Sequence, residues 1–236
     1  MAALATLSAA MSDQFADITH WVFDLDNTLY PAECNLFLQV DRNIQQFIMD
    51  LFDLPPDEAR KLQKSYFHEH GTTLNGLMAK HGIEPEEFLE YVHDIDVSPV
   101  PPNAALNAAL AKLPGRKVIY TNGSVPHAQR VTDRLGVSHH FDGVFDIVAA
   151  EYVPKPEPAP YDILIEQFDI DPARAVMVED LARNLKPAHE RGMTTVWVRN
   201  DHHWSGGNED DPHIHHVIDD LSDWLVAVTD RLAPSP

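Results

Sequence analysis

The sequence has a single cysteine, and it contains no long apolar run. Cys34 alone cannot form a disulfide within the chain, which is typical of a protein in a reducing compartment. A secretory signal and a stretch of about 18 apolar residues are both missing, so we expect neither export nor a membrane span. These absences predict a cytoplasmic protein that does not contact a membrane.

Basic residues are also scarce, because 17 Lys and Arg stand against 37 Asp and Glu, for a formal net charge of −20. A surface this acidic repels phosphate backbones, which excludes nucleic acid polymers as expected partners. A small anionic substrate can bind only where a cation and local donors reverse the sign of the field. A site for such a substrate therefore predicts a bound metal ion.

The remaining composition is that of an ordinary globular protein, with 44% hydrophobic and 23% charged residues. A chain of 236 residues is long enough for one core domain and a smaller inserted module. Residues 1–17 are Ala-rich at their start and are expected to be a flexible leader.

Five short apolar segments, each bounded by polar residues, have the pattern of buried strands. They are residues 20–24, 117–121, 144–148, 175–179 and 194–198. Helical patterns lie between them, at residues 103–112, 124–135, 159–168 and 181–191. This alternation predicts an α/β fold with a doubly wound, mostly parallel, Rossmann-like sheet, whose ligand crevice opens at the carboxyl ends of the strands.

Residues 31–102 interrupt the alternation with helical patterns alone. Four amphipathic segments follow one another without a convincing strand, at residues 37–52, 56–69, 74–81 and 85–93. A proline-rich connector at residues 98–102 cannot continue a helix. We therefore expect a small α-helical cap domain over residues 31–102, inserted into a core made of residues 18–30 and 103–236.

Near the carboxyl end of the chain, residues 200–216 contain five histidines, two glycines and several acidic residues. The histidines are irregularly spaced, which favours a solvated surface loop over a metal site. We assign this segment no function.

Asp24 and Asp26 follow the first predicted strand, and both carboxylates can face one crevice if the backbone leaves the pleat there. An Asp-x-Asp triplet alone is more often a surface turn. Here three further polar segments follow in order along the chain, at residues 119–122, 155–156 and 178–180. The set of four is far more specific than the triplet.

In these four motifs the chain resembles the haloacid dehalogenase superfamily of phosphohydrolases. The matching motifs are Phe-Asp-Leu-Asp-Asn-Thr-Leu at 23–29, Ile-Tyr-Thr-Asn at 119–122, Lys-Pro at 155–156 and Val-Glu-Asp at 178–180. The resemblance covers residues 18–199, and the insertion lies where the family carries a helical cap. Three segments, 26–31, 71–76 and 179–184, are similar to the pyrimidine 5′-nucleotidase branch.

This resemblance implies a Mg²⁺-dependent phosphatase that acts through an aspartyl-phosphate on Asp24. Asp26 would protonate the leaving group, which requires a raised pKa, and nearby negative charge is expected to raise it. Thr121 and Lys155 would bind and neutralise the transferred phosphoryl group. Backbone N–H groups at Asn122 and Gly123 would add donors to the phosphate.

The family's metal-ligand positions match Asp24, the backbone carbonyl of Asp26, and Asp180. By the same resemblance, Glu179 would hold a metal-bound water and Asn184 would orient the acidic loop. Next to the phosphate-binding segment, Ser124 fits a helix N-cap.

In the predicted cap, Thr72, Thr73 and Asn75 lie in a Gly-flanked loop where they can read a base or a sugar. Helix capping is an equally good interpretation of these three residues.

The expected substrate is a small phosphate monoester, with a pyrimidine nucleoside 5′-monophosphate favoured and phosphoglycolate or a sugar phosphate left open. A 2-haloacid dehalogenase needs no metal, so Asp26, Glu179 and Asp180 speak against that class. A non-catalytic binding protein on the same fold normally lacks the nucleophile or the metal-binding acid, and neither is missing here. The chain is expected to be a monomer or a homodimer.

Overall fold

The computed structural model of the protein describes residues 15–200 and 207–233. Within them, six strands form one sheet in the order β3-β2-β1-β4-β5-β6, and every neighbouring pair is parallel. The strands are β1 (His20–Phe23), β2 (Arg116–Tyr120), β3 (Gly143–Phe145), β4 (Ala175–Glu179), β5 (Thr194–Val198) and β6 (His216–Ile218). This is a doubly wound order, which confirms the predicted α/β fold.

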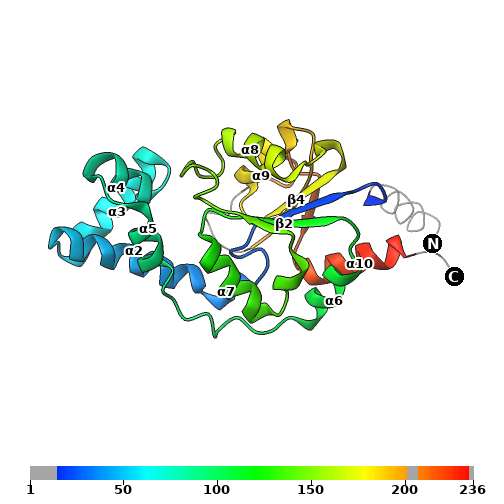
Figure 1. Ribbon diagram of the computed structural model, residues 1–236, viewed down its shortest axis with the longest axis horizontal. Helices are drawn as coiled ribbons and strands as arrows, with labels where there is room; N and C mark the ends of the chain where they lie inside the picture. Colours follow the sequence, from blue (N-terminus) through cyan, green and yellow to red (C-terminus); the bar gives the residue numbers. More distant parts are fainter. Residues whose placement is uncertain (1–14, 201–206, 234–236) are drawn as a thin grey trace.

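Helices cover both faces of the sheet (Figure 1). On one face lie α6 (Ala104–Lys112), α7 (Val125–Leu135) and α10 (Leu221–Leu232), which share an apolar core with Trp21 and Phe23. On the other lie α8 (Ala159–Phe168) and α9 (Ala182–Glu190), which pack with Val22. Alternate side chains of β1 thus point to opposite faces, as the two-residue period of a strand requires.

The chain changes direction across the sheet at β1. From β1 it continues to β2 and β3 on one side, and it then returns to place β4 against the opposite edge of β1. A crevice forms at the carboxyl ends of the strands where the strand order reverses in this way. The residues that directly follow β1, β2 and β4 are therefore brought together from distant parts of the sequence.

Residues 36–92 form four helices beside the sheet, and this segment is called the helical insert below (Figure 1). They are α2 (Leu36–Phe52), α3 (Pro56–His70), α4 (Thr73–His81) and α5 (Pro85–Val92). Proline occupies the first position of α3 and α5, where its missing N–H costs nothing. Each predicted helical segment agrees with an observed helix to within one residue at either end.

Three short 3₁₀ helices complete the described elements, at Ala32–Cys34, Ser138–His140 and Pro172–Arg174. Strand β3 is shorter than predicted and ends at Phe145, because the next residue begins a turn in which Asp146 accepts the N–H of Ala149.

The end of the chain adds structure that the sequence patterns did not predict. β6 begins at the last residue of the expected His-rich loop, and α10 follows it, capped by the Asp220 side chain on the N–H of Asp223 at 2.8 Å. His202 and His203 of that loop lie outside the described residues, as do residues 1–14 of the predicted leader. Phe15, assigned to the leader, is buried against Trp21 and Trp224.

Two further features bear on function. None of the helices within the described residues is long and apolar enough to cross a membrane.

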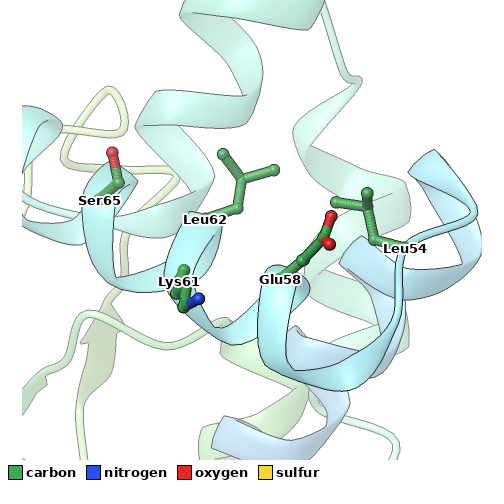
Figure 2. A pocket seen from close by; sticks show the side chains of 5 residues that line it. All are labelled: Leu54, Glu58, Lys61, Leu62 and Ser65. Atoms are coloured by element: carbon green, nitrogen blue, oxygen red, sulfur yellow. The ribbon is translucent and has the colours of Figure 1, made fainter.

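A surface pocket lies on the helical insert, lined by Leu54, Glu58, Lys61, Leu62 and Ser65 (Figure 2). None of the predicted site residues lines this pocket.

Candidate active site

The predicted catalytic residues meet at the carboxyl edge of the sheet. Asp24 directly follows β1, Thr121 follows β2, and Glu179 and Asp180 lie at the end of β4. Lys155 arrives from the loop between β3 and α8. All five are buried, so the charged groups of Asp24, Lys155, Glu179 and Asp180 face one another with little intervening water.

Lys155 is the centre of this cluster. Its ammonium donates to Asp24 Oδ1 at 2.6 Å, to Glu179 Oε2 at 2.7 Å and to the carbonyl of Tyr120 at 2.9 Å. Burial acts to lower the pKa of Lys155, but the two carboxylates outweigh it and raise that pKa above its usual value. Lys155 therefore stays charged at neutral pH, as its predicted role requires.

Asp24 is held by both of its carboxylate oxygens, because Thr28 Oγ1 donates to Oδ2 at 2.9 Å while Lys155 contacts Oδ1. Burial and the neighbouring Glu179 raise the pKa of Asp24 to about 7, against the opposing effect of Lys155. Burial and Glu179 likewise raise the pKa of Asp180 well above its usual range. The site thus has more negative charge than one ammonium can balance.

This donor set fits a divalent cation such as Mg²⁺. One carboxylate oxygen from each of Asp24, Glu179 and Asp180 lies within 4.8 Å of the other two. Mg²⁺ favours hard oxygen ligands of this kind, and its charge would offset the surplus of carboxylates. Both oxygens of Glu179 already accept protein donors, Lys155 and the N–H of Leu181, so Asp24 and Asp180 are better placed as direct ligands.

The acidic loop is held by residues that the sequence patterns did not single out. Asn200 donates to Asp180 Oδ2 at 3.0 Å, and the indole of Trp197 donates to the carbonyl of Asp180 at 2.9 Å. For Asn184, predicted to orient this loop, the described residues show a buried Oδ1 without a hydrogen-bond partner. Its backbone carbonyl accepts the Tyr161 hydroxyl at 2.6 Å, which holds α9 rather than the loop.

The segment after β2 is folded closely against its neighbours. Thr121 Oγ1 accepts the N–H of Gly123 at 2.9 Å, which leaves its own proton to donate. A Cβ on Gly123 would lie 3.2 Å from Thr121 Oγ1 and 3.2 Å from His127 Cδ2, so the position is suited to glycine. Asn122 uses its side chain to bind the backbone of Lys155, with its Oδ1 accepting the Lys155 N–H at 2.8 Å.

The environment of Asp26 differs from the prediction. Burial acts to raise its pKa, but His127 and Tyr30 outweigh that effect and lower the pKa of Asp26 to about 2. Asp26 Oδ1 accepts the Tyr30 hydroxyl at 2.6 Å and is 2.8 Å from His127 Nε2. The expectation that nearby negative charge raises this pKa is therefore wrong, because His127 and the Tyr30 hydroxyl both contact Oδ1 of the carboxylate.

Ser124 is the residue before α7, but its hydroxyl does not cap the helix. It pairs instead with His93 Nδ1 at 3.0 Å, while Asp146 Oδ2 accepts the N–H of Val125 at 3.0 Å. Ser124 therefore occupies the predicted N-cap position, but a carboxylate from the turn after β3 makes the capping bond in place of its side chain.

The three polar residues predicted in the cap have partners within the helical insert. Thr72 Oγ1 accepts the N–H of Asn75 at 3.0 Å and thereby caps α4. Thr73 is buried and donates to the carbonyl of Gln63, and the Asn75 amide donates to the carbonyl of His70. These contacts favour the capping interpretation of the loop for Thr72.

Sequence reasoning missed Thr28, Tyr30 and His127 as neighbours of the two aspartates. Thr28 and Tyr30 each lie four residues after the aspartate that they contact, a spacing that the turn after β1 brings together. For His127 the helical pattern offered no signal, because a buried histidine on an amphipathic helix normally belongs to the core.

Comparison with known proteins places this geometry in a family. Residues 18–190 match the haloacid dehalogenase-like hydrolases, a match that spans more than half of the chain. The chain belongs to this family of hydrolases.

Two curated relatives cover part of the chain. Phosphate metabolism protein 8 of Saccharomyces cerevisiae is 28% identical over 192 residues, which cover 74% of this chain and 59% of that protein. Protein CbbY of Cereibacter sphaeroides is 26% identical over 119 residues, which cover 49% of this chain and 51% of that protein. The chain therefore spans less than two thirds of the length of either relative.

Three solved structures share the fold. CbbY from Rhodobacter sphaeroides in complex with phosphate has a TM-score of 0.62 at 19% identity, covering 89% of this chain and 99% of that chain. YfnB from Bacillus subtilis, bound to magnesium, has a TM-score of 0.59 at 13% identity, and the match covers 89% of this chain and 98% of that chain. A 2-haloacid dehalogenase from Pseudomonas syringae has a TM-score of 0.57 at 19% identity, and the match covers 90% of this chain and 99% of that chain. At these identities the likeness shows the fold alone.

Proposed function

We propose that the protein is a Mg²⁺-dependent phosphatase that hydrolyses a small phosphate monoester. The observation that carries the proposal is the buried contact between Lys155 and Asp24, next to Glu179 and Asp180 at the switch point of the sheet. A carboxylate flanked by an ammonium and by a cation-binding pair is suited to attack an anionic centre that it would otherwise repel.

In the proposed reaction Asp24 attacks phosphorus, and the bond from phosphorus to the leaving oxygen breaks. Asp26 gives a proton to that oxygen, and it then takes one from the water that cleaves the aspartyl-phosphate. The two donors to Asp26 keep it ionised in the free chain, so in the first turnover the proton passes from the phosphate-ester monoanion to Asp26 and from Asp26 to the leaving oxygen.

Positive charge and hydrogen-bond donors would hold the phosphoryl group during both displacements. Lys155 neutralises its charge, and the Thr121 hydroxyl and backbone N–H groups at Asn122 and Gly123 donate to its oxygens. Asp24, Asp180 and the backbone carbonyl of Asp26 would hold Mg²⁺. Bound there, Mg²⁺ supplies charge that stabilises the phosphoryl oxygens.

For the substrate we propose a pyrimidine nucleoside 5′-monophosphate, with phosphoglycolate and sugar phosphates as alternatives. Support for a phosphate ester comes from the name of the yeast relative and from the phosphate in the CbbY structure. Residues 31–102 are proposed to be a cap domain that faces the remainder of the substrate. The motif likeness in residues 26–31, 71–76 and 179–184 supports the nucleotide.

A phosphate-release screen over CMP, UMP, AMP, phosphoglycolate and sugar phosphates, with Mg²⁺ or with chelator, tests this proposal. We expect release from at least one ester with Mg²⁺, loss of activity in chelator, and no turnover by Asp24→Asn, whose amide cannot attack phosphorus. The same screen includes a 2-haloacid, because dehalogenases share the fold. Halide release without phosphate release would replace the proposed phosphatase by a dehalogenase.

A further inference from the structure

A buried histidine contacts the proposed acid-base residue. His127 lies on α7, is 1% exposed, and places its Nε2 2.8 Å from Asp26 Oδ1. The same oxygen accepts the Tyr30 hydroxyl at 2.6 Å. Two donors from different elements converge on one oxygen, which fixes the rotation of the carboxylate about its side-chain bonds. Within the described residues no hydrogen bond reaches the second oxygen, Oδ2, which leaves it available to a ligand.

The unpartnered nitrogen of His127 indicates which tautomer is present. Its Nδ1 is buried and has no hydrogen-bond partner among the residues that the structure describes. A proton on Nδ1 would leave a buried donor unsatisfied, whereas a proton on Nε2 leaves only a lone pair without a partner. We therefore assign the proton to Nε2, so that His127 donates to Asp26.

His127 is itself held from the end of the helical insert. His93, which directly follows α5, stacks on His127 with ring centroids 4.6 Å apart and an interplanar angle of 13°. The other edge of the His93 ring is bonded to Ser124 at the start of α7. From the same helix, Arg130 donates to the carbonyls of His93 and Ile95.

The segment that leads from the insert back to the core is thus bonded to the helix that carries His127. One face of α7, with residues spaced by three or four positions, provides all of these contacts. A change in the position of His93 would therefore change the support of His127. The acid-base carboxylate and the end of the insert are connected through two stacked rings.

We propose that His127 is a positioning residue for Asp26 and that His93 keeps the His127 ring in place from the end of the insert. This inference rests on the proposed function, in which Asp26 exchanges a proton with the leaving oxygen. Correct alignment matters because a displacement of about 1 Å in a reacting group can cost a factor of roughly 100 in rate. The positioning role concerns proton transfer and not the attack by Asp24.

The experiment compares two phosphate esters whose leaving groups differ in their need for a proton. An alkyl phosphate requires protonation of its leaving oxygen, whereas nitrophenyl phosphate releases a stable anion. For each ester, kcat/KM reports the steps up to departure of the leaving group. His127→Phe keeps a ring for stacking but removes the donor, and His127→Gln keeps an N–H donor near the position of Nε2.

We expect His127→Phe to lower kcat/KM for the alkyl ester about tenfold or more beyond its effect on the nitrophenyl ester. His127→Gln should restore most of the difference. His93→Ala, which removes the stack, should shift the ratio in the same direction as His127→Phe, and His93→Phe should shift it less. His140→Gln, in the 3₁₀ helix Ser138–His140 that follows α7, serves as a histidine control with an unchanged ratio.

One result would overturn the inference: an unchanged ratio of kcat/KM between the two esters in folded His127→Phe, whether both values fall equally or neither falls. If His127→Phe does not fold, His93→Ala decides the question by the same ratio, because it removes the stack on His127 and leaves both donors to Asp26 Oδ1 in the chain. Failure of the wild-type chain to release phosphate from either ester is a different result, because it refutes the proposed function before any variant is compared.

Discussion

Replacing Lys155 by methionine tests the charge balance of the site. The change removes two ion pairs of 2.6 and 2.7 Å and leaves Asp24 and Glu179 buried without their ammonium partner. The side chain of Lys155 is 2% exposed, so water cannot simply replace the lost charge. Breaking a buried ion pair costs about 3–5 kcal/mol. For a chain of this size we expect Tm to fall by about 6–20 °C in the absence of metal.

Lys117 provides a matched control, because it is another buried lysine, on β2 of the sheet. It is 8% exposed, and its ammonium donates to the carbonyl of Gly115 at 2.9 Å rather than to a carboxylate. Lys117→Met loses one hydrogen bond to a neutral acceptor, which is worth about 1 kcal/mol. We therefore expect its Tm to fall by only about 2–4 °C.

Thermal unfolding of both variants, followed by calorimetry in chelator and then with Mg²⁺, is the assay. Mg²⁺ should recover part of the loss in Lys155→Met, because a bound cation offsets the same carboxylates, and it should leave Lys117→Met unchanged relative to wild type. If the two variants unfold within about 2 °C of each other in chelator, the buried charges do not govern stability as reasoned here.

Three other predictions concern separate parts of the site. Asp180→Ala should raise the Mg²⁺ concentration for half-maximal activity by about tenfold or more, and Asn184→Ala by less; equal shifts would contradict the ligand assignment. Burial and His127 lower the pKa of His93 to about 4 when folded, from 6.5. The contribution of His93 to the free energy of unfolding is therefore present above pH 6.5 and is lost as the pH falls towards 4. The loss is about 2 kcal/mol between pH 7 and 5. In His93→Phe, the free energy of unfolding measured with urea should not show this loss between pH 7 and 5. A pH dependence equal to that of the wild type would contradict the prediction. Gly123→Ala should lower kcat, because its Cβ would lie 3.2 Å from both Thr121 Oγ1 and His127 Cδ2 and would displace these side chains of the site; kinetics as in wild type would contradict this crowding.

The local sequence pattern was sufficient to predict most of the helices and strands. β4 and β5 have the predicted bounds, and the helices of the insert begin and end within one residue of the expected positions. Strand and helix are determined largely by the period of apolar residues and by Pro and Gly at the ends, and these are visible in a short window. β6 was missed because its three residues are too few to show a period beside the His-rich segment.

Part of the candidate site could also be predicted from the local sequence. Asp24, Thr121 and Asp180 could be predicted from the sequence to lie at one edge of the sheet, because each follows an apolar strand and parallel strands align their carboxyl ends. Lys155 was found from a motif, but only the structure shows its contact with Asp24, across 131 positions in the chain. Contacts of this kind depend on strand order, which no local window contains.

The sequence by itself therefore determined which residues end the strands, and with them the composition of the acidic cluster. Tertiary structure decided the state of Asp26, because its partner His127 lies 101 positions later and no local pattern joins the two. Without that partner the acidic neighbourhood predicted a raised pKa, and with it the pKa is lowered to about 2. The two donors, His127 and Tyr30, outweighed both burial and the acidic surroundings, since electrostatic effects are strongest at hydrogen-bond distance and weaken as separation grows.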